Sequence, residues 1–248
     1  MTSSFGLPGI TGDRLGLVVG HSLPVEEYAG SGSRVQVKVD PLPAVVLFDL
    51  GDHVVLPRHG AGSYTPAHLL PHHAHVAALA RLGCDRVLSI ASVGSLRRDW
   101  GVGTVVAPED FIGLQVNPSF HDDAAAHTVP GFDLGWRSQI IEAWRSATST
   151  PIQDTGVYVQ STGPRFETPA EVRMLATFGD VVGMTIVAEC ILAKEAGIRF
   201  AAVCTVDNMA NGLGDDLLTA EEFRSGIEEN RVRLRSDLKA VLPALVRG

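Results

Sequence analysis

Three short segments hold side chains that could bind a flat heterocycle and an anion together. Residues 163–171 read GPRFETPAE, residues 183–189 read GMTIVAE and residues 205–208 read TVDN. An aromatic ring, a carboxylate and an amide suit a heterocycle, whereas an arginine, a hydroxyl and backbone N–H groups suit an anion. The sequence therefore predicts a composite binding site where these segments meet.

Alternating strand and helix patterns predict the elements that position these segments. We expect strands at residues 15–20, 44–48, 53–56, 86–92, 104–107, 155–160 and 200–206, and a short strand that ends at residues 183–185. Helices are expected at residues 72–82, 134–146, 168–178, 187–196 and 219–242. Such alternation indicates an α/β fold, a single domain over residues 1–248 with a central mixed β-sheet flanked by helices. Ligands bind beyond the carboxyl ends of the strands in open α/β sheets, where the three segments fall.

Several residues are expected to mark the ends of these elements. Gly94 is expected to end the strand at 86–92, and Asp207 to end the strand at 200–206. Thr168 and Thr219 are predicted helix caps, and Pro243 is expected to lie just beyond the last helix. The long segment 108–133 is predicted to be a functional or mobile loop.

Composition excludes several classes of partner. A net charge of −8 argues against nucleic acid and anionic membranes, because both require a basic surface. No apolar run reaches the roughly 18 residues of a membrane span, and the N-terminus lacks the pattern of a secretory signal. The odd number of cysteines, all in apolar runs, favours a reducing compartment. We therefore expect a soluble, cytoplasmic protein.

Six motifs in order resemble the trimeric purine nucleoside phosphorylase and methylthioadenosine phosphorylase family. They are VVGHS at 18–22, LPRHG at 56–60, SVGSL at 92–96 and the three segments described above. The resemblance extends from about residue 15 to the last predicted helix. It implies reversible phosphorolysis, in which inorganic phosphate displaces a purine from C1′ of a nucleoside to give ribose 1-phosphate and free base.

The resemblance implies a set of donors for the phosphate. A phosphate dianion that acts as a nucleophile needs several fixed donors rather than one strong acid. By resemblance these donors are Ser22, Arg58, His59, the backbone N–H of Ser92 and the hydroxyl of Thr185.

The resemblance also implies the residues that contact the purine. Glu167 and Asn208 would stabilise the departing base and, with His59, form the catalytic set, while Phe166 would stack on the base. Val93 and Gly94 would complete the purine pocket. An asparagine at 208 and a glutamate at 167 resemble the 6-oxopurine branch of the family. A shift of one residue in this correspondence would instead make Asp207 the base reader.

The sugar site is implied by four further residues. Met184 would lie under the ribose, and Ala220 and Phe223 would form an apolar pocket for the 5′ group. This pocket resembles the branch that accepts methylthio nucleosides, so 5′-methylthioinosine and 5′-methylthioadenosine are alternative substrates. His127 resembles the position that reaches the neighbouring subunit's site, and the implied assembly is a homotrimer.

The chain departs from the family pattern at residues 71–75, which read PHHAH where Asn-Tyr-x-Ala-Asn is usual, and at Ala91 and Ala188. The histidines at 68, 72, 73 and 75 could suggest a metal, but no cysteine or carboxylate joins them at ligand spacing, so we expect no metal and no organic cofactor. A hydrolase on the same scaffold and a purine-binding protein without turnover remain alternatives to the phosphorylase.

Overall fold

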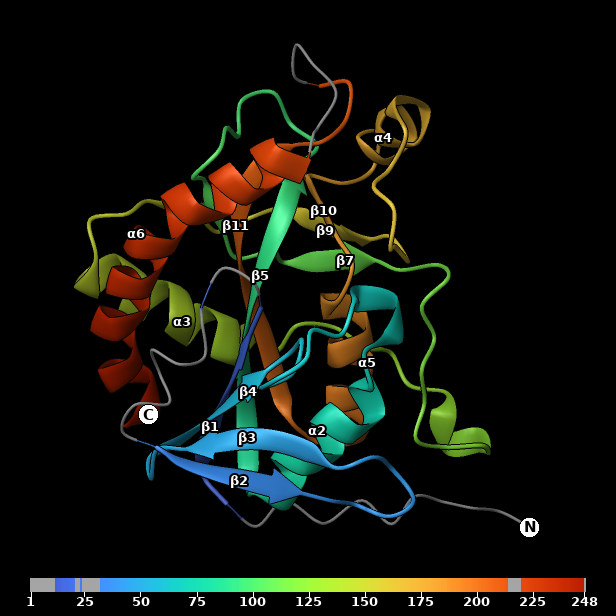
Figure 1. The fold of residues 1–248 in the computed structure, drawn as a ribbon, viewed down its shortest axis with the longest axis vertical. Helices are drawn as coiled ribbons and strands as arrows, with labels where there is room; N and C mark the ends of the chain where they lie inside the picture. Colours follow the sequence, from blue (N-terminus) through green and yellow to red (C-terminus); the bar gives the residue numbers. More distant parts are fainter. Residues whose placement is uncertain (1–11, 21–22, 24–31, 214–219, 248) are drawn as a thin grey trace.

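The computed structural model describes residues 12–20, 23, 32–213 and 220–247 of the chain. An 11-stranded mixed sheet forms its centre, which confirms the predicted fold class (Figure 1). The strands are β1 (Arg14–Val19), β2 (Ser33–Val37), β3 (Val45–Asp49), β4 (His53–Pro57), β5 (Cys84–Ser95), β6 (Val105–Val106), β7 (Asp110–Ile112), β8 (Ile152–Gln153), β9 (Val157–Gln160), β10 (Val181–Gly183) and β11 (Arg199–Met209).

Helices cover both faces of this sheet. The α-helices are α2 (His72–Arg81), α3 (Leu134–Ala147), α4 (Pro169–Leu175), α5 (Ile186–Glu195) and α6 (Ala220–Val246), and the short 3-10 helices are η1 (Ala67–Leu69) and η2 (Ala124–Ala126). Helices α3 and α6 lie on one face, and α2 and α5 lie on the other (Figure 1). None of the helices among the described residues is long and apolar enough to cross a membrane.

β5 organises the sheet because it has three neighbours. It runs parallel to β1 and β11 and antiparallel to β10. The alternation of side chains along these strands sends Leu88, Ile90 and Val203 into the core under α3 and α6. Ala91, Val93 and Cys204 enter the core under α2 and α5 instead. Both faces of the central strands are therefore buried, as their nearly continuous apolar sequences require.

The two central strands are longer than the sequence predicts. β5 continues through Gly94 to Ser95, and β11 continues through Asp207 to Met209 with a β-bulge after Val206. The expected stops at Gly94 and Asp207 are therefore wrong. Polar and small residues normally break a strand, but here both neighbouring strands continue together, so their backbone groups remain paired.

Other differences concern short elements and one proline. The sequence did not predict β2, β7 and β8, of which β7 and β8 have only three and two residues, and β2 is a largely exposed strand at the sheet edge. Helix α6 runs through Pro243 to Val246 rather than ending before it. A proline in the last turn removes a single hydrogen bond, and burial of Leu245 in the core favours continuing the helix. The predicted cap Thr219 lies outside the described residues.

The segment from 108 to 133, expected to be one long loop, contains β7 and η2. The other predicted cap is confirmed, because Thr168 and Glu171 form a capping box at the start of α4, with Pro169 as the first residue of the helix.

All three cysteines are buried and free.

Candidate functional site

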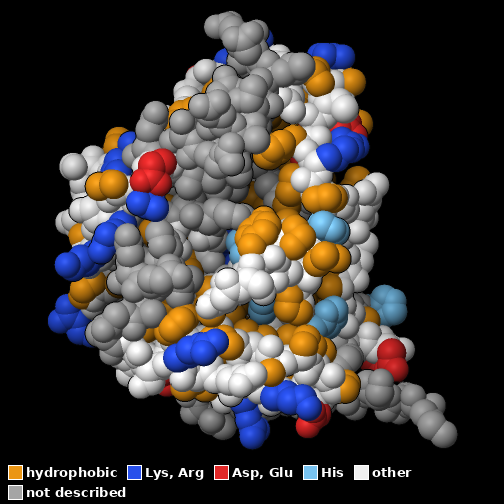
Figure 2. Space-filling view, viewed as in Figure 1, with side chains coloured by type: hydrophobic (Ala, Val, Ile, Leu, Met, Phe, Trp, Pro, Cys, Tyr) orange, Lys and Arg blue, Asp and Glu red, His pale blue; other side chains and the backbone are white. Residues whose placement is uncertain are grey.

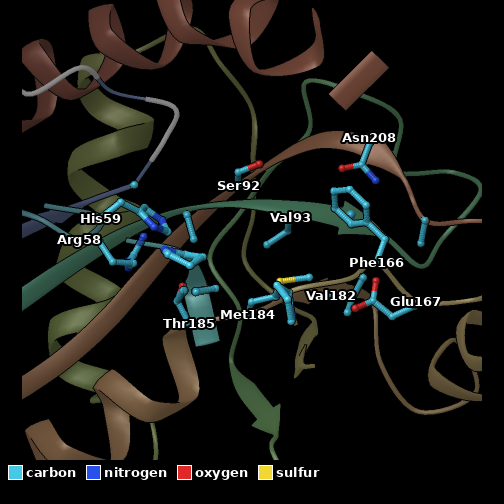
Figure 3. Close-up of a pocket in the computed structure, with 18 of the residues that line it drawn as sticks. Arg58, His59, Ser92, Val93, Phe166, Glu167, Val182, Met184, Thr185 and Asn208 are labelled. Atoms are coloured by element: carbon cyan, nitrogen blue, oxygen red, sulfur yellow. The ribbon is translucent and has the colours of Figure 1, made fainter. Parts of the chain in front are cut away.

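A cavity of about 380 Å³ lies where the carboxyl ends of β4, β5, β10 and β11 meet the turn before α4 and the start of α5. Its walls combine residues from the six motifs that are far apart in the chain. Together with residues outside the motifs, the full lining is Gly20, Arg58, His59, Tyr64, Pro66, Ala67, Ala91, Ser92, Val93, Gly94, Pro164, Phe166, Glu167, Val182, Gly183, Met184, Thr185, Asn208, Ala210 and Asn211. Figure 3 shows Arg58, His59 and Thr185 at one end and Phe166, Glu167 and Asn208 at the other.

Arg58 anchors the first end of the cavity as a buried cation. Its Nε and Nη2 atoms donate to the two carboxylate oxygens of Glu189 over 2.5 and 3.1 Å. Nη2 also donates to Ser89 Oγ (2.6 Å), and Nη1 donates to the carbonyl oxygen of Ile90 (2.9 Å). Ser89 Oγ in turn donates to Glu189 Oε2 (2.7 Å). Four of the five N–H donors of Arg58 are therefore used to fix its plane, which leaves one N–H of Nη1.

The Arg58–Glu189 pair stays ionised although both side chains are almost fully buried. Burial would raise the pKa of Glu189, but the charge and hydrogen bonds of Arg58 outweigh it and hold this pKa below its ordinary value. Likewise, burial would lower the pKa of Arg58, but the charge of Glu189 raises it. The cavity thus has a permanently charged guanidinium, and the Glu189 carboxylate balances this charge.

The His59 ring lines the cavity next to Arg58. Its Nδ1 atom lies 2.8 Å from the carbonyl oxygen of Thr65, and its ring stacks on Tyr64 with centroids 5.2 Å apart. Because a carbonyl oxygen only accepts, Nδ1 carries the proton. These two contacts set the ring orientation at the edge of the cavity.

Thr185 and Ser92 add hydroxyl groups beside Arg58. Thr185 precedes α5 as its N-cap, where the helix dipole favours an anion. The backbone N–H of Thr185 donates to the Tyr158 hydroxyl (3.3 Å) and that of Val187 donates to Gln160 Oε1 (2.6 Å). The Thr185 hydroxyl makes no capping bond to the helix, so it is a group that this helix end can offer to a ligand.

Ser92 lies inside β5, opposite Thr205 of β11, and not at a strand end as the sequence suggests. Its Oγ atom is buried and has no hydrogen-bond partner among the described residues. A buried hydroxyl without a partner is costly, so a ligand atom at this position would be stabilised. The prediction assigned the backbone N–H of Ser92 to the phosphate, whereas the geometry makes the hydroxyl the unused group.

At the opposite end, Glu167 points an unused carboxylate oxygen into buried space. The residue is 9% exposed, and its Oε1 atom has no hydrogen-bond partner among the described residues. The backbone carbonyl of Glu167 accepts from Asn211 Nδ2 (2.7 Å), which ties this turn to the end of β11. Phe166 stands beside Glu167 and is 37% exposed, so its ring can cover a flat ligand (Figure 3).

Asn208 completes this end, and Asp207 does not. Asn208 lines the cavity beside Gly94, and its Nδ2 atom donates to the carbonyl oxygen of Met209 (2.9 Å). Asp207 is 1% exposed, and its Oδ1 atom accepts from Asn230 Nδ2 (2.7 Å) on α6. The geometry thus favours Asn208 over Asp207 as the side chain that meets a ligand.

The middle of the cavity is apolar. Met184, Val93 and Val182 lie between the two polar ends (Figure 3). Gly163 makes room for Met184, because a Cβ atom at this glycine would lie 2.6 Å from Met184 Sδ, and its φ of 59° is in the left-handed region. A ligand that fills the site therefore has a polar head at each end and an apolar body between them.

Four predicted residues are not brought to this cavity by the described structure. Ser22 lies outside the described residues, and the side chains of Ala220 and Phe223 in α6 are likewise not described. His127 is exposed at the end of η2, where its Nδ1 atom lies 3.3 Å from the carbonyl oxygen of Ala124. Its predicted contact with a neighbouring subunit stays a prediction.

The sequence prediction missed Glu189, Tyr64 and Asn211. Glu189 belongs to the GMTIVAE motif, and its position on a strongly apolar helix is the signal that a buried cation must lie nearby. Tyr64 and Asn211 carry no such signal, since aromatic and amide residues in loops are usually solvated.

Three of the four histidines considered for a metal site, His72, His73 and His75, lie in the first turn of α2. The rings of His72 and His75 meet edge to face with centroids 6.2 Å apart, and His73 Nε2 lies 2.9 Å from the carbonyl oxygen of Ser119. Within the part of the chain that the structure describes, no group of three or more His, Cys, Asp or Glu side chains could hold a metal ion.

Comparison with known proteins agrees with this geometry. A family model described as "Phosphorylase superfamily" matches residues 14–243. A probable 6-oxopurine nucleoside phosphorylase of Archaeoglobus fulgidus is 36% identical over 78% of this chain and 79% of its own length. A probable S-methyl-5'-thioinosine phosphorylase of Methanothermobacter thermautotrophicus is 35% identical over 83% of this chain and 72% of its own.

The fold is also similar to solved structures. A methylthioadenosine phosphorylase from Schistosoma mansoni in complex with adenine has a TM-score of 0.79 at 24% identity, covering 95% of this chain and 91% of its own. This likeness concerns the fold, since the sequences have diverged widely.

Proposed function

The chain belongs to the phosphorylase superfamily, and we propose that it catalyses the reversible phosphorolysis of 6-oxopurine nucleosides to free base and ribose 1-phosphate. One observation carries the proposal. A single cavity has anion donors at one end, an apolar middle and a carboxylate with an amide at the other, which matches phosphate, sugar and base in this order.

The anion end suits phosphate as a nucleophile. Arg58 and His59 from the turn after β4, Ser92 from β5 and Thr185 from the start of α5 supply the donors, so phosphate can be held without being neutralised by one acid. A phosphate oxygen attacks C1′ of the sugar, the C1′–N9 bond breaks and its electron pair passes to the purine. Ser22, outside the described residues, is a further proposed donor.

The base end stabilises the charge that the purine gains. Beside its bond to Met209, Asn208 has a second N–H, which can donate to N7 or O6, the two atoms that become more negative as the glycosidic bond breaks. Glu167 has an unused carboxylate oxygen that can accept the N1–H of a 6-oxopurine. Adenine has an acceptor at N1, so an ionised Glu167 would repel it. Because of these two side chains, we propose that the site prefers 6-oxopurines to adenine.

A 5′-methylthioinosine substrate is the second candidate. The methanogen relative is named for this activity, and the base end would read the same hypoxanthine. The two candidates differ only at the 5′ group, for which we propose Ala220 and Phe223 as the contacts, with Met184 under the ribose.

We further propose a cytoplasmic homotrimer that needs no metal or organic cofactor. Support for an assembly comes from exposed hydrophobic side chains, among them Leu69 (62%) and Leu114 (88%). Figure 2 shows hydrophobic side chains and histidines gathered on one face of the molecule. His127 is the proposed contribution of one subunit to its neighbour's site.

The test is release of hypoxanthine from inosine, followed by absorbance with and without inorganic phosphate. We expect release only with phosphate. Release that is equally fast in water would identify a hydrolase, and a bound base without any release would identify a binding protein. With 5′-methylthioinosine in parallel, the ratio of kcat/KM values ranks the two candidate substrates.

A further inference from the structure

Asp207 and Asn208 are adjacent in the chain, yet their side chains lie in different surroundings. Val206 of β11 pairs with Val93 of β5, but the next paired residue is Asn208, opposite Gly94. Asp207 is thus the extra residue of a β-bulge, a feature that often re-aims side chains beside active sites. A slip of one residue would exchange the carboxylate and the amide at the cavity.

Asn230 of α6 is the side chain that anchors this bulge. Its Nδ2 atom donates to the carbonyl oxygen of Val206 (3.0 Å) and to Asp207 Oδ1 (2.7 Å), so it holds both sides of the bulge. Asn230 is 3% exposed and Asp207 is 1% exposed. Water cannot easily replace these two contacts, since both partners are buried.

Arg233 fixes which way the Asn230 amide faces. Its Nη2 atom donates to Asn230 Oδ1 (2.9 Å) and to the carbonyl oxygen of Gly103 (2.6 Å). Because the amide oxygen faces Arg233, the amide nitrogen must face the bulge. Gly103 permits this approach, since a Cβ atom there would lie 2.9 Å from Arg233 Nη2, and its φ is 91°.

We propose that Asn230 is a specificity-determining positioning residue, which selects Asn208 rather than Asp207 as the side chain that reads the base. This inference rests on the proposed function. N7 and O6 of a 6-oxopurine are both acceptors, so they require the amide N–H₂ of Asn208. The 6-amino group of adenine is a donor, which a carboxylate accepts. Anchoring of Asp207 to α6 thus excludes a side chain that would favour adenine.

The test compares the affinities of wild-type and variant protein for the two free bases. Asn230→Leu keeps the side-chain volume but removes the amide. We expect the ratio of the adenine to the hypoxanthine dissociation constant to fall at least about tenfold. The dissociation constant for inorganic phosphate should change less than about twofold, a difference that a general loss of structure would not produce.

Three further variants make the test specific. Val232→Ala, on the exposed side of α6, is the matched control and should leave the ratio unchanged. Asp207→Asn keeps an acceptor for Asn230 Nδ2 and should retain the ratio within about twofold. Arg233→Met removes an exposed side chain that orients the amide, and we expect a smaller fall of about threefold. If Asn230→Leu does not fold, Arg233→Met decides the question.

An unchanged ratio in Asn230→Leu, or in Arg233→Met where it decides, would overturn the inference. Weakening of both bases and phosphate alike would overturn it too, because Asn230 would then be only structural. The inference would also be overturned if the wild-type protein bound adenine and hypoxanthine equally well, because there would then be no selectivity for Asn230 to determine. Free bases can be measured even if inosine is not cleaved, so failure of the proposed phosphorolysis is a separate result.

Discussion

At the scale of single residues, the site depends on two buried carboxylates in opposite situations. Glu189 has its charge matched by Arg58 and its oxygens occupied by Arg58 and Ser89. Glu167 keeps one buried oxygen without a partner among the described residues. The first carboxylate is satisfied within the protein and supports the site, while the second is left for a ligand. Hydrogen bonding therefore separates two roles that the residue type does not distinguish.

Glu189→Gln tests the supporting role of the first carboxylate. Removing one partner of a buried ion pair leaves an uncompensated charge and typically costs about 3–5 kcal/mol of stability. We expect a loss of this size in chemical denaturation, together with a higher KM for phosphate, because the Arg58 plane is no longer fixed. Glu142→Gln, on the exposed face of α3, is the matched control. Unchanged phosphate KM in a folded Glu189→Gln enzyme would contradict this role.

Asn208→Asp tests the base reader directly. The substitution replaces a donor with a carboxylate that N7 and O6 of hypoxanthine would repel, so the kcat/KM ratio of inosine to adenosine should fall by about 10²-fold. Steady-state rates with both nucleosides give this ratio. Asn117→Asp makes the same chemical change in an exposed loop and should have no effect. Unchanged selectivity in Asn208→Asp would show that another side chain reads the base.

At the scale of elements, the sequence predicts the centres of the strands better than their ends. Hydrophobic runs place β5 and β11 correctly, because both faces of these strands are buried. Gly94 and Asp207 look like strand terminators, but Gly94 gives Asn208 room and Asp207 binds Asn230. Both roles depend on contacts between segments far apart in the chain, which local sequence does not encode.

Two histidines of α2, the buried His75 and the half-buried His72, predict that the protein is sensitive to acid. Burial lowers the pKa of His72 to about 4 and that of His75 to about 3. Histidine in an unfolded chain titrates near 6.5, so the unfolded state binds more protons between about pH 3 and 6.5. The stability that these neutral rings contribute is complete above about pH 6.5 and is lost as the pH falls.

We therefore expect the free energy of unfolding to decrease below about pH 6.5, by up to about 1.4 kcal/mol per pH unit for each histidine. Denaturant titrations at a series of pH values measure this slope. His75→Met should make the slope shallower, whereas His127→Asn changes an exposed side chain and should leave it as it is. An equal slope in wild type and His75→Met would mean that other groups cause the acid sensitivity.

At the scale of the whole molecule, the alternation of strand and helix patterns was enough to predict the fold class, and the six motifs were enough to predict the family. The motifs come from strands and turns that are far apart in the chain, and the fold brings residues from all of them to one cavity. The sequence could not predict which hydrogen-bond or ion-pair partner each polar side chain has. The Arg58–Glu189 pair and the Asp207–Asn230 contact each join residues from separate elements. Such pairs follow from packing rather than from motif spacing.

The proposed homotrimer is a property of the assembled molecule and can be tested without substrate. We expect light scattering to give about three times the mass of the 26.3 kDa chain. Activity measured over a dilution series should fall where the trimer dissociates, if the neighbour completes the site. A monomer with full activity would contradict both the assembly and the role of His127.

The most direct test of phosphorolysis is a count of both products in one sample. Inosine and inorganic phosphate are incubated with the enzyme, hypoxanthine is followed by absorbance and phosphorus compounds by nuclear magnetic resonance. The proposed reaction predicts one new sugar phosphate for each hypoxanthine released, and no hypoxanthine when phosphate is left out. Hypoxanthine formed with free ribose and unchanged phosphate would contradict it, because water and not phosphate would then be the nucleophile.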